Sequence, residues 1–111
     1  MSKQELPAVI ETYQHAHDQR QTDKALAAFA DDATVIDEGD SYAGTDRIRW
    51  WLENAASEFT FTRTLISVED LGGGVHLVHN HLAGNFPGGE ADLGYRFQLR
   101  NGLIAHLEIA P

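Results

Sequence analysis

Hydrophobic residues follow helical spacing at the start of the chain. An apolar residue recurs every three or four positions between residues 6 and 16, which predicts an amphipathic helix. These positions are Leu6, Val9, Ile10, Tyr13 and Ala16. Ser2 and Glu5 precede them with the spacing of a capping box, and Pro7 is tolerated in a first helical turn.

Two shorter helices are expected further along. The first of them begins at Thr22 or Asp23 and buries Leu26 and Phe29. The next is capped by Thr45. Its predicted apolar face consists of Ile48, Trp51, Leu52, Ala55 and Phe59.

Strand patterns dominate the rest of the chain. A short strand is expected at Thr34–Ile36, and four more follow residue 59, separated by turns at residues 72–74, 87–89 and 101–102. The last two predicted strands have apolar faces at Leu93, Tyr95, Phe97 and Leu99, and at Ala105, Leu107 and Ile109. Helices followed by a run of strands predict an α+β fold, with helices covering one face of an antiparallel sheet.

Composition excludes several classes of function. The 111 residues suggest one domain, 1–111. A net charge of −9 with only eight Lys and Arg argues against binding nucleic acid or an anionic membrane surface. Because there is no cysteine, disulfides and thiolate chemistry are excluded. Neither a signal peptide nor a membrane-spanning stretch is evident, so a cytoplasmic location is expected.

Three segments resemble one known superfamily. They are AVIETYQHAHDQRQTDKALAAFADDATVIDEG, YAGTDRIRWWLENA and YRFQLRNGLIAHLEI, and the resemblance spans nearly the whole chain. They are similar to the nuclear transport factor 2-like superfamily, which includes SnoaL-like polyketide cyclases, ketosteroid isomerases and scytalone dehydratases. The resemblance implies a cone-shaped fold, three helices and a curved sheet around a pocket for a small apolar ligand. It also implies a homodimer formed through the outer sheet face, and chemistry without a cofactor.

Tyr13 and Asp37 are the first candidate catalytic residues. Ketosteroid isomerases carry a hydrogen-bonding tyrosine on the first helix and a general-base aspartate just after the first strand, and these residues stand at those positions. A desolvated carboxylate is a useful base, and a tyrosine hydroxyl can stabilise an oxyanion. The alternatives are a strand-end acid in water and a core tyrosine. The isomerases also need a protonated aspartate on a later strand, where this chain has Leu93 and Tyr95.

His79 and His81 are the other candidates. Strand alternation places them on one face with Leu77 and Ala83, and the resemblance turns this face toward the pocket. Asp37 with either histidine would resemble the acid–base pair of scytalone dehydratases. With the opposite parity, the two histidines would lie on the outer face, in a dimer interface.

The other predicted pocket-lining residues come from several elements. They are Trp51, Leu77, Ala83, Leu93, Tyr95, Phe97 and Leu107. The His-x-His spacing also fits a metal site with Asp37 as third ligand, but the ligand set is incomplete, so neither a metal nor a cofactor is predicted.

Two functions remain open from the sequence. One is a cofactor-independent isomerase, cyclase or dehydratase acting on a small apolar carbonyl or hydroxyl compound. The other is a non-catalytic ligand-binding or dimeric accessory domain, since one fold hosts many activities.

Overall fold

The computed structural model describes residues 6–56 and 58–111, and this part of the chain forms an α+β fold. The predicted fold class is therefore confirmed. Its elements are α1 (Ala8–Asp18), α2 (Thr22–Ala27), β1 (Phe29–Asp37), β2 (Asp40–Ala43), α3 (Thr45–Glu53), β3 (Phe61–Gly72), β4 (Val75–Gly84), β5 (Glu90–Arg100) and β6 (Leu103–Ala110). The capping-box residues Ser2 and Glu5 lie outside the described residues.

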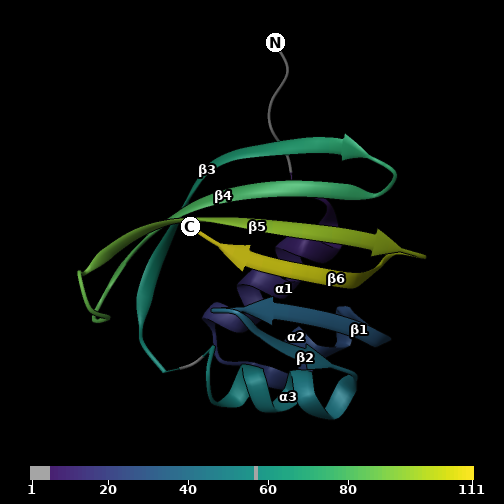
Figure 1. Ribbon diagram of the computed structural model, residues 1–111, viewed down its shortest axis with the longest axis horizontal. Helices are drawn as coiled ribbons and strands as arrows, with labels where there is room; N and C mark the ends of the chain where they lie inside the picture. The colour runs from purple at the N-terminus through teal and green to yellow at the C-terminus, as the bar shows by residue number, and fades with distance from the viewer. Residues whose placement is uncertain (1–5, 57) are drawn as a thin grey trace.

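The strands form one curved sheet in the order β2-β1-β6-β5-β4-β3 (Figure 1). Neighbouring strands are antiparallel except β1 and β6, which run parallel and place Val35 beside Leu107. The sheet is therefore mixed, and the expectation of a wholly antiparallel sheet is wrong at this one pairing. Turn and strand patterns in the sequence report only on neighbours along the chain, and β1 and β6 are far apart in it.

The first strand is longer than its apolar core suggests, and it turns back into a second strand. The predicted segment Thr34–Ile36 lies within β1, which runs from Phe29 to Asp37. Glu38 and Gly39 both have positive φ and join β1 to β2 in a hairpin. The sequence did not reveal β2 because only Tyr42 of its four residues is buried, so the strand carries no alternating apolar pattern.

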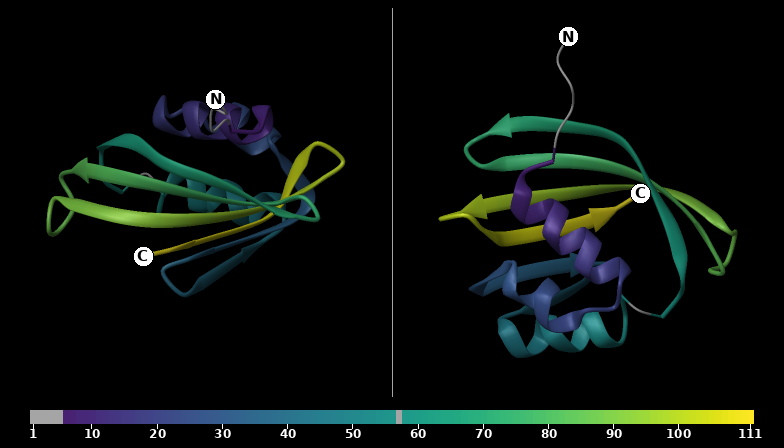
Figure 2. Two further views of the ribbon diagram at one scale, coloured as in Figure 1. Left: turned by 90° about the horizontal axis from the view of Figure 1, so that it is seen from above. Right: turned by 180° about the vertical axis from the view of Figure 1, so that it is seen from behind.

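Helix α1 lies across one face of the sheet and forms the main core with it (Figure 2). Three of its predicted apolar residues, Ile10, Tyr13 and Ala16, are buried. They belong to the same core as Phe97 of β5 and Leu107 of β6. No helix in residues 6–56 and 58–111 is long and apolar enough to cross a membrane.

Strand β4 turns the opposite set of side chains toward the core from the set expected. Val78, Asn80 and Leu82 are buried, whereas His79 and His81 are only half-buried and lie on the outer face. The register with β5 explains this parity, because His81 pairs directly with Asp92, whose neighbour Leu93 faces inward. Both faces of β4 carry apolar residues, so the sequence pattern alone does not distinguish them.

Candidate active site

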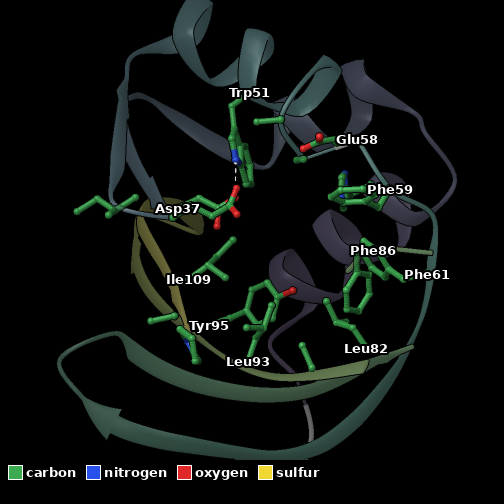
Figure 3. A pocket seen from close by; sticks show the side chains of 18 of the residues that line it. Asp37, Trp51, Glu58, Phe59, Phe61, Leu82, Phe86, Leu93, Tyr95 and Ile109 are labelled. Carbon is green, nitrogen blue, oxygen red and sulfur yellow. Dashed lines mark hydrogen bonds between the residues drawn. The ribbon is translucent and has the colours of Figure 1, made fainter. Parts of the chain in front are cut away.

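A cavity of about 740 Å³ opens between the end of β1, helix α3 and the strands β3 to β6 (Figure 3). Its wall is largely hydrophobic and aromatic, with a few polar groups, which is typical of a small-molecule site. Aromatic side chains in the wall are Tyr13, Trp51, Phe59, Phe61, Phe86 and Tyr95. Charged side chains in the wall are Asp37, Glu38, Glu58, Arg63 and Glu108.

Asp37 faces the cavity because of its position on β1. Ala33 and Val35 are fully buried, and the two-residue period of a strand places Asp37 on the same face. Its Oδ2 accepts a hydrogen bond of 3.0 Å from Nε1 of Trp51. Burial raises the pKa of the Asp37 carboxyl, against the opposing effects of the Trp51 bond and of the Glu38 backbone N–H, and the nearby Asp40 charge adds to the increase.

Two tyrosines in the cavity wall are protonated hydrogen-bond donors. Tyr95 is buried on β5, and its hydroxyl points into the cavity (Figure 3). Tyr13 on α1 is 1% exposed, and its ring packs edge-on against Phe29 and Phe97 at centroid distances of 5.2 and 6.0 Å. Burial raises the pKa of both phenols, so they keep their protons at neutral pH.

Arg63 on β3 contributes a buried positive charge to the cavity wall. Its Nη2 lies 2.8 Å from Oδ1 of Asp18, and its Nε donates to Oδ2 at 3.3 Å. Its side chain is only 8% exposed. Burial opposes the charge, but the hydrogen bond to Asp18 and the nearby Tyr95 raise the pKa of the guanidinium above its ordinary value. Arg63 was not predicted as a wall residue from the sequence. The alternation of β3 places it on the same face as Phe61, whereas Thr62 and Thr64 are exposed on the opposite face.

His17 is a second wall residue that the sequence analysis missed. Its ring is 7% exposed and stacks between Tyr13 and Trp51, with centroid distances of 6.1 and 6.4 Å. Burial, together with the Arg63 charge, lowers the pKa of His17 to about 4, although a hydrogen bond to the Ala56 backbone opposes the decrease. The imidazole is therefore neutral at pH 7. The sequence could have indicated this wall position, because His17 follows Tyr13 by four residues and a helix places such residues on the same face.

Comparison with known proteins identifies the superfamily. No protein-family model and no curated protein matches the chain. Among solved structures, a candidate polyketide cyclase from Sinorhizobium meliloti is 32% identical, with a TM-score of 0.87 and 95% of both chains covered. The chain belongs to the SnoaL-like, nuclear transport factor 2-like superfamily. The predicted family is thus confirmed for this SnoaL-like protein.

More distant structures show the same fold. A protein from Catenulispora acidiphila with a ketosteroid isomerase-like fold, in complex with trimethylamine, is 15% identical, with a TM-score of 0.83 over 96% of this chain and 87% of its own. A Mycobacterium tuberculosis protein in complex with estradiol-17β-hemisuccinate is also 15% identical, with a TM-score of 0.78 over 96% and 95%. At 15% identity, the likeness between these two structures and this chain shows only that they share a fold.

The structure brings together only part of the predicted site. The predicted residues that line the cavity are Tyr13, Asp37, Trp51, Leu93 and Tyr95. The expectation that His79 and His81 face the cavity is wrong, because His79 lies 3.1 Å from the Ser67 hydroxyl and His81 contacts Asp92 and Glu90 on the outer face. Four more predicted wall residues lie elsewhere: Leu77 and Ala83 share the outer face, and Phe97 and Leu107 belong to the core.

The residues considered for a metal site lie apart. Asp37 faces the cavity, whereas His79 and His81 are on the other face of the sheet. Within residues 6–56 and 58–111, no group of three or more His, Asp or Glu side chains is arranged to hold a metal ion. The polar side chains that the described residues bring to the cavity include a carboxylate, tyrosine hydroxyls and a guanidinium.

Proposed function

We propose that this SnoaL-like protein is a cofactor-independent acid–base enzyme that acts on a small, largely apolar carbonyl compound, with Asp37 as the base. The observation that carries the proposal is the Asp37 carboxylate, half-buried in a largely hydrophobic cavity and oriented by Trp51. Burial raises the pKa of this carboxyl. A raised pKa makes a carboxylate a stronger proton acceptor, provided that it is still ionised at the working pH.

In the proposed reaction, an Asp37 oxygen removes a proton from the carbon next to the substrate carbonyl. The electron pair of that C–H bond forms the new carbon–carbon double bond, and the carbonyl π electrons move to oxygen, giving an enolate. A tyrosine hydroxyl in the wall, Tyr95 or Tyr13, donates a hydrogen bond to this oxygen. If the substrate has a β,γ-double bond, return of the proton from Asp37 to the γ-carbon of the dienolate gives isomerisation. Transfer of that proton to a departing β-hydroxyl releases water and gives dehydration. Attack of the enolate carbon on a second carbonyl, whose oxygen then takes the proton from Asp37, gives cyclisation.

The size and lining of the cavity support a ring compound as the substrate. A volume of about 740 Å³ is within the range of small-molecule pockets. The Sinorhizobium meliloti relative is a candidate polyketide cyclase, and the Mycobacterium tuberculosis structure holds a steroid ester. Both support a substrate with fused or closing rings.

The proposal is tested by proton exchange into a simple ketone. The probe is 2-tetralone in D₂O, whose α-protons are followed by NMR with and without the protein. We expect the wild type to accelerate exchange and Asp37→Asn to lose about 10²-fold or more of this acceleration, because Asn accepts no proton. Asp31→Asn, the same change at an exposed position of β1, is the matched control and should retain full exchange.

Two results would contradict the enzyme proposal. One is exchange that survives in Asp37→Asn, which would exclude this residue as the base. The other is binding of 2-tetralone by the wild type, seen as shifted ligand resonances, with exchange at the buffer rate. The second result would favour the non-catalytic ligand-binding alternative.

A further inference from the structure

The two hydrogen bonds to Asp18 do not use every donor nitrogen of the Arg63 guanidinium. Asp18 takes up Nε and Nη2, and Nη1 is buried without a hydrogen-bond partner among residues 6–56 and 58–111. Leaving donors of a buried charged group unpaired costs free energy. An ion pair that only joined α1 to β3 would not need a buried, unpaired donor at Nη1. The buried guanidinium therefore calls for a functional explanation.

The surroundings of Arg63 direct its charge toward Tyr95. The guanidinium carbon lies 5.4 Å from the centre of the Tyr95 ring and 5.7 Å from that of Phe61. The Arg63 charge also opposes the burial-driven rise in the pKa of both Tyr95 and Tyr13. A phenol close to a fixed positive charge is a better hydrogen-bond donor to a negatively charged oxygen.

The charges of the cavity wall fit a reaction in which negative charge moves. Among the described wall residues, four carry carboxylates: Asp37, Glu38, Glu58 and Glu108. Arg63 is the one permanent cation among the same residues, because His17 is neutral at pH 7. This balance disfavours an anionic substrate. It suits a neutral ketone, because proton transfer to Asp37 neutralises one carboxylate while the new charge appears on the ketone oxygen.

We infer that Arg63 acts through the Tyr95 hydroxyl to form the oxyanion site of the cavity, which binds the carbonyl oxygen of a neutral ketone. Tyr95 is then the catalytic donor that touches the substrate, and Arg63 is a positioning residue held by Asp18. This inference rests on the proposed function, because an oxyanion forms only if a proton is removed.

The inference is tested with 4-nitrophenol, whose phenolate resembles an enolate and absorbs at a longer wavelength than the phenol. The measurements use the full chain with Asp37→Asn, in which the asparagine stands for the protonated base. The apparent pKa of bound 4-nitrophenol is read from its absorbance across pH. We expect it to lie below the pKa of the free phenol, because the site favours the anion.

Substitutions on the two sides of the ion pair should act in opposite directions. Arg63→Met removes the positive charge and should raise the apparent pKa of the bound phenol by at least one unit, a tenfold weaker preference for the phenolate. Asp18→Asn keeps Arg63 but removes its counter-charge, and should lower that pKa. Tyr95→Phe should raise it. Arg100→Met, at an exposed arginine paired with Asp32, is the matched control and should change nothing.

The opposite signs separate this role from a structural one. If Arg63 and Asp18 only held α1 against β3, both substitutions would weaken binding together and leave the apparent pKa in place, which would overturn the inference. Absence of 4-nitrophenol binding by Asp37→Asn would also overturn it. Should Arg63→Met fail to fold, Asp18→Asn and Tyr95→Phe still give a result. Ketone exchange by the wild type is a separate measurement, so either proposal can fail alone.

Discussion

The indole of Trp51 and the carboxylate of Asp37 form the best-defined polar contact of the cavity. The indole N–H donates to the carboxylate at 3.0 Å and thereby lowers the pKa of Asp37, while burial raises it. Since a general base works only when ionised, this hydrogen bond, by opposing the effect of burial, extends the proposed reaction further into the acidic range.

Trp51→Phe tests this effect on the base. The variant keeps an aromatic ring but loses the donor, so the pKa of Asp37 rises and the acidic limb of the pH profile for ketone exchange moves to higher pH. The loss of rate should be largest at acidic pH and should disappear at alkaline pH, where Asp37 is ionised in both proteins.

The control for this prediction is the neighbouring tryptophan. Trp50 is 52% exposed and stacks on Tyr42. Trp50→Phe makes the same change in side chain and should leave the acidic limb in place. A profile that moved equally in both variants would exclude the Trp51 hydrogen bond as its cause.

Among the elements, the β3–β4 hairpin has a close backbone contact at Gly84. A Cβ at this position would lie 2.1 Å from the Thr60 carbonyl oxygen and 2.7 Å from the Phe61 Cα. We expect Gly84→Ala to separate the two strands and reduce the free energy of unfolding by about 1–3 kcal/mol, the usual cost of overpacking. Chemical denaturation at pH 7 measures the loss.

Gly94 on β5 provides the matched substitution. A Cβ there would meet its nearest atoms, in Ala110 and His79, at 3.6 Å, an ordinary contact. Gly94→Ala should therefore leave stability unchanged or raise it by about 0.5 kcal/mol, because alanine restricts the unfolded chain. If both glycine variants lost the same stability, close backbone contact would not explain the effect at Gly84.

The elements that could be predicted are those with one strongly apolar face. The buried apolar residues of α1 and α3, and the inward Tyr95 and Phe97 of β5, follow directly from residue spacing. The inward face of β4 could not be predicted from residue spacing, because both faces of this strand are similarly apolar. Its register with β5 decides which face points inward. At the site, the resemblance brought out Tyr13 and Asp37, but Arg63 needed the contact between α1 and β3, which residue spacing does not specify.

For the whole molecule, acid stability should depend on His17. Its pKa is lowered to about 4 in the fold and returns to an ordinary value near 6.5 on unfolding. Between these two values the unfolded chain binds a proton that the folded chain does not. The free energy of unfolding therefore falls as the pH drops from 7 to 4, and the contribution of His17 reaches about 3 kcal/mol.

Comparison of two histidine variants isolates this contribution. His17→Gln removes the titrating group, so the variant should lose less stability than the wild type between pH 7 and pH 4. His15→Gln, at an exposed position of the same helix, should follow the wild type. Denaturant unfolding at several pH values gives the comparison, and parallel curves for all three proteins would contradict the prediction.

The parallel pairing of β1 with β6 has a consequence for synthesis on the ribosome. Strand β6, residues 103–110, lies between β1 and β5, so it joins the β2–β1 hairpin to the rest of the sheet. Until these residues have left the exit tunnel, the nascent chain can form only local helices and hairpins, and the apolar faces of β1 and β5 lack the strand between them. The sheet should therefore close only once β6 has emerged, and chaperones that bind exposed apolar segments can engage the chain until then.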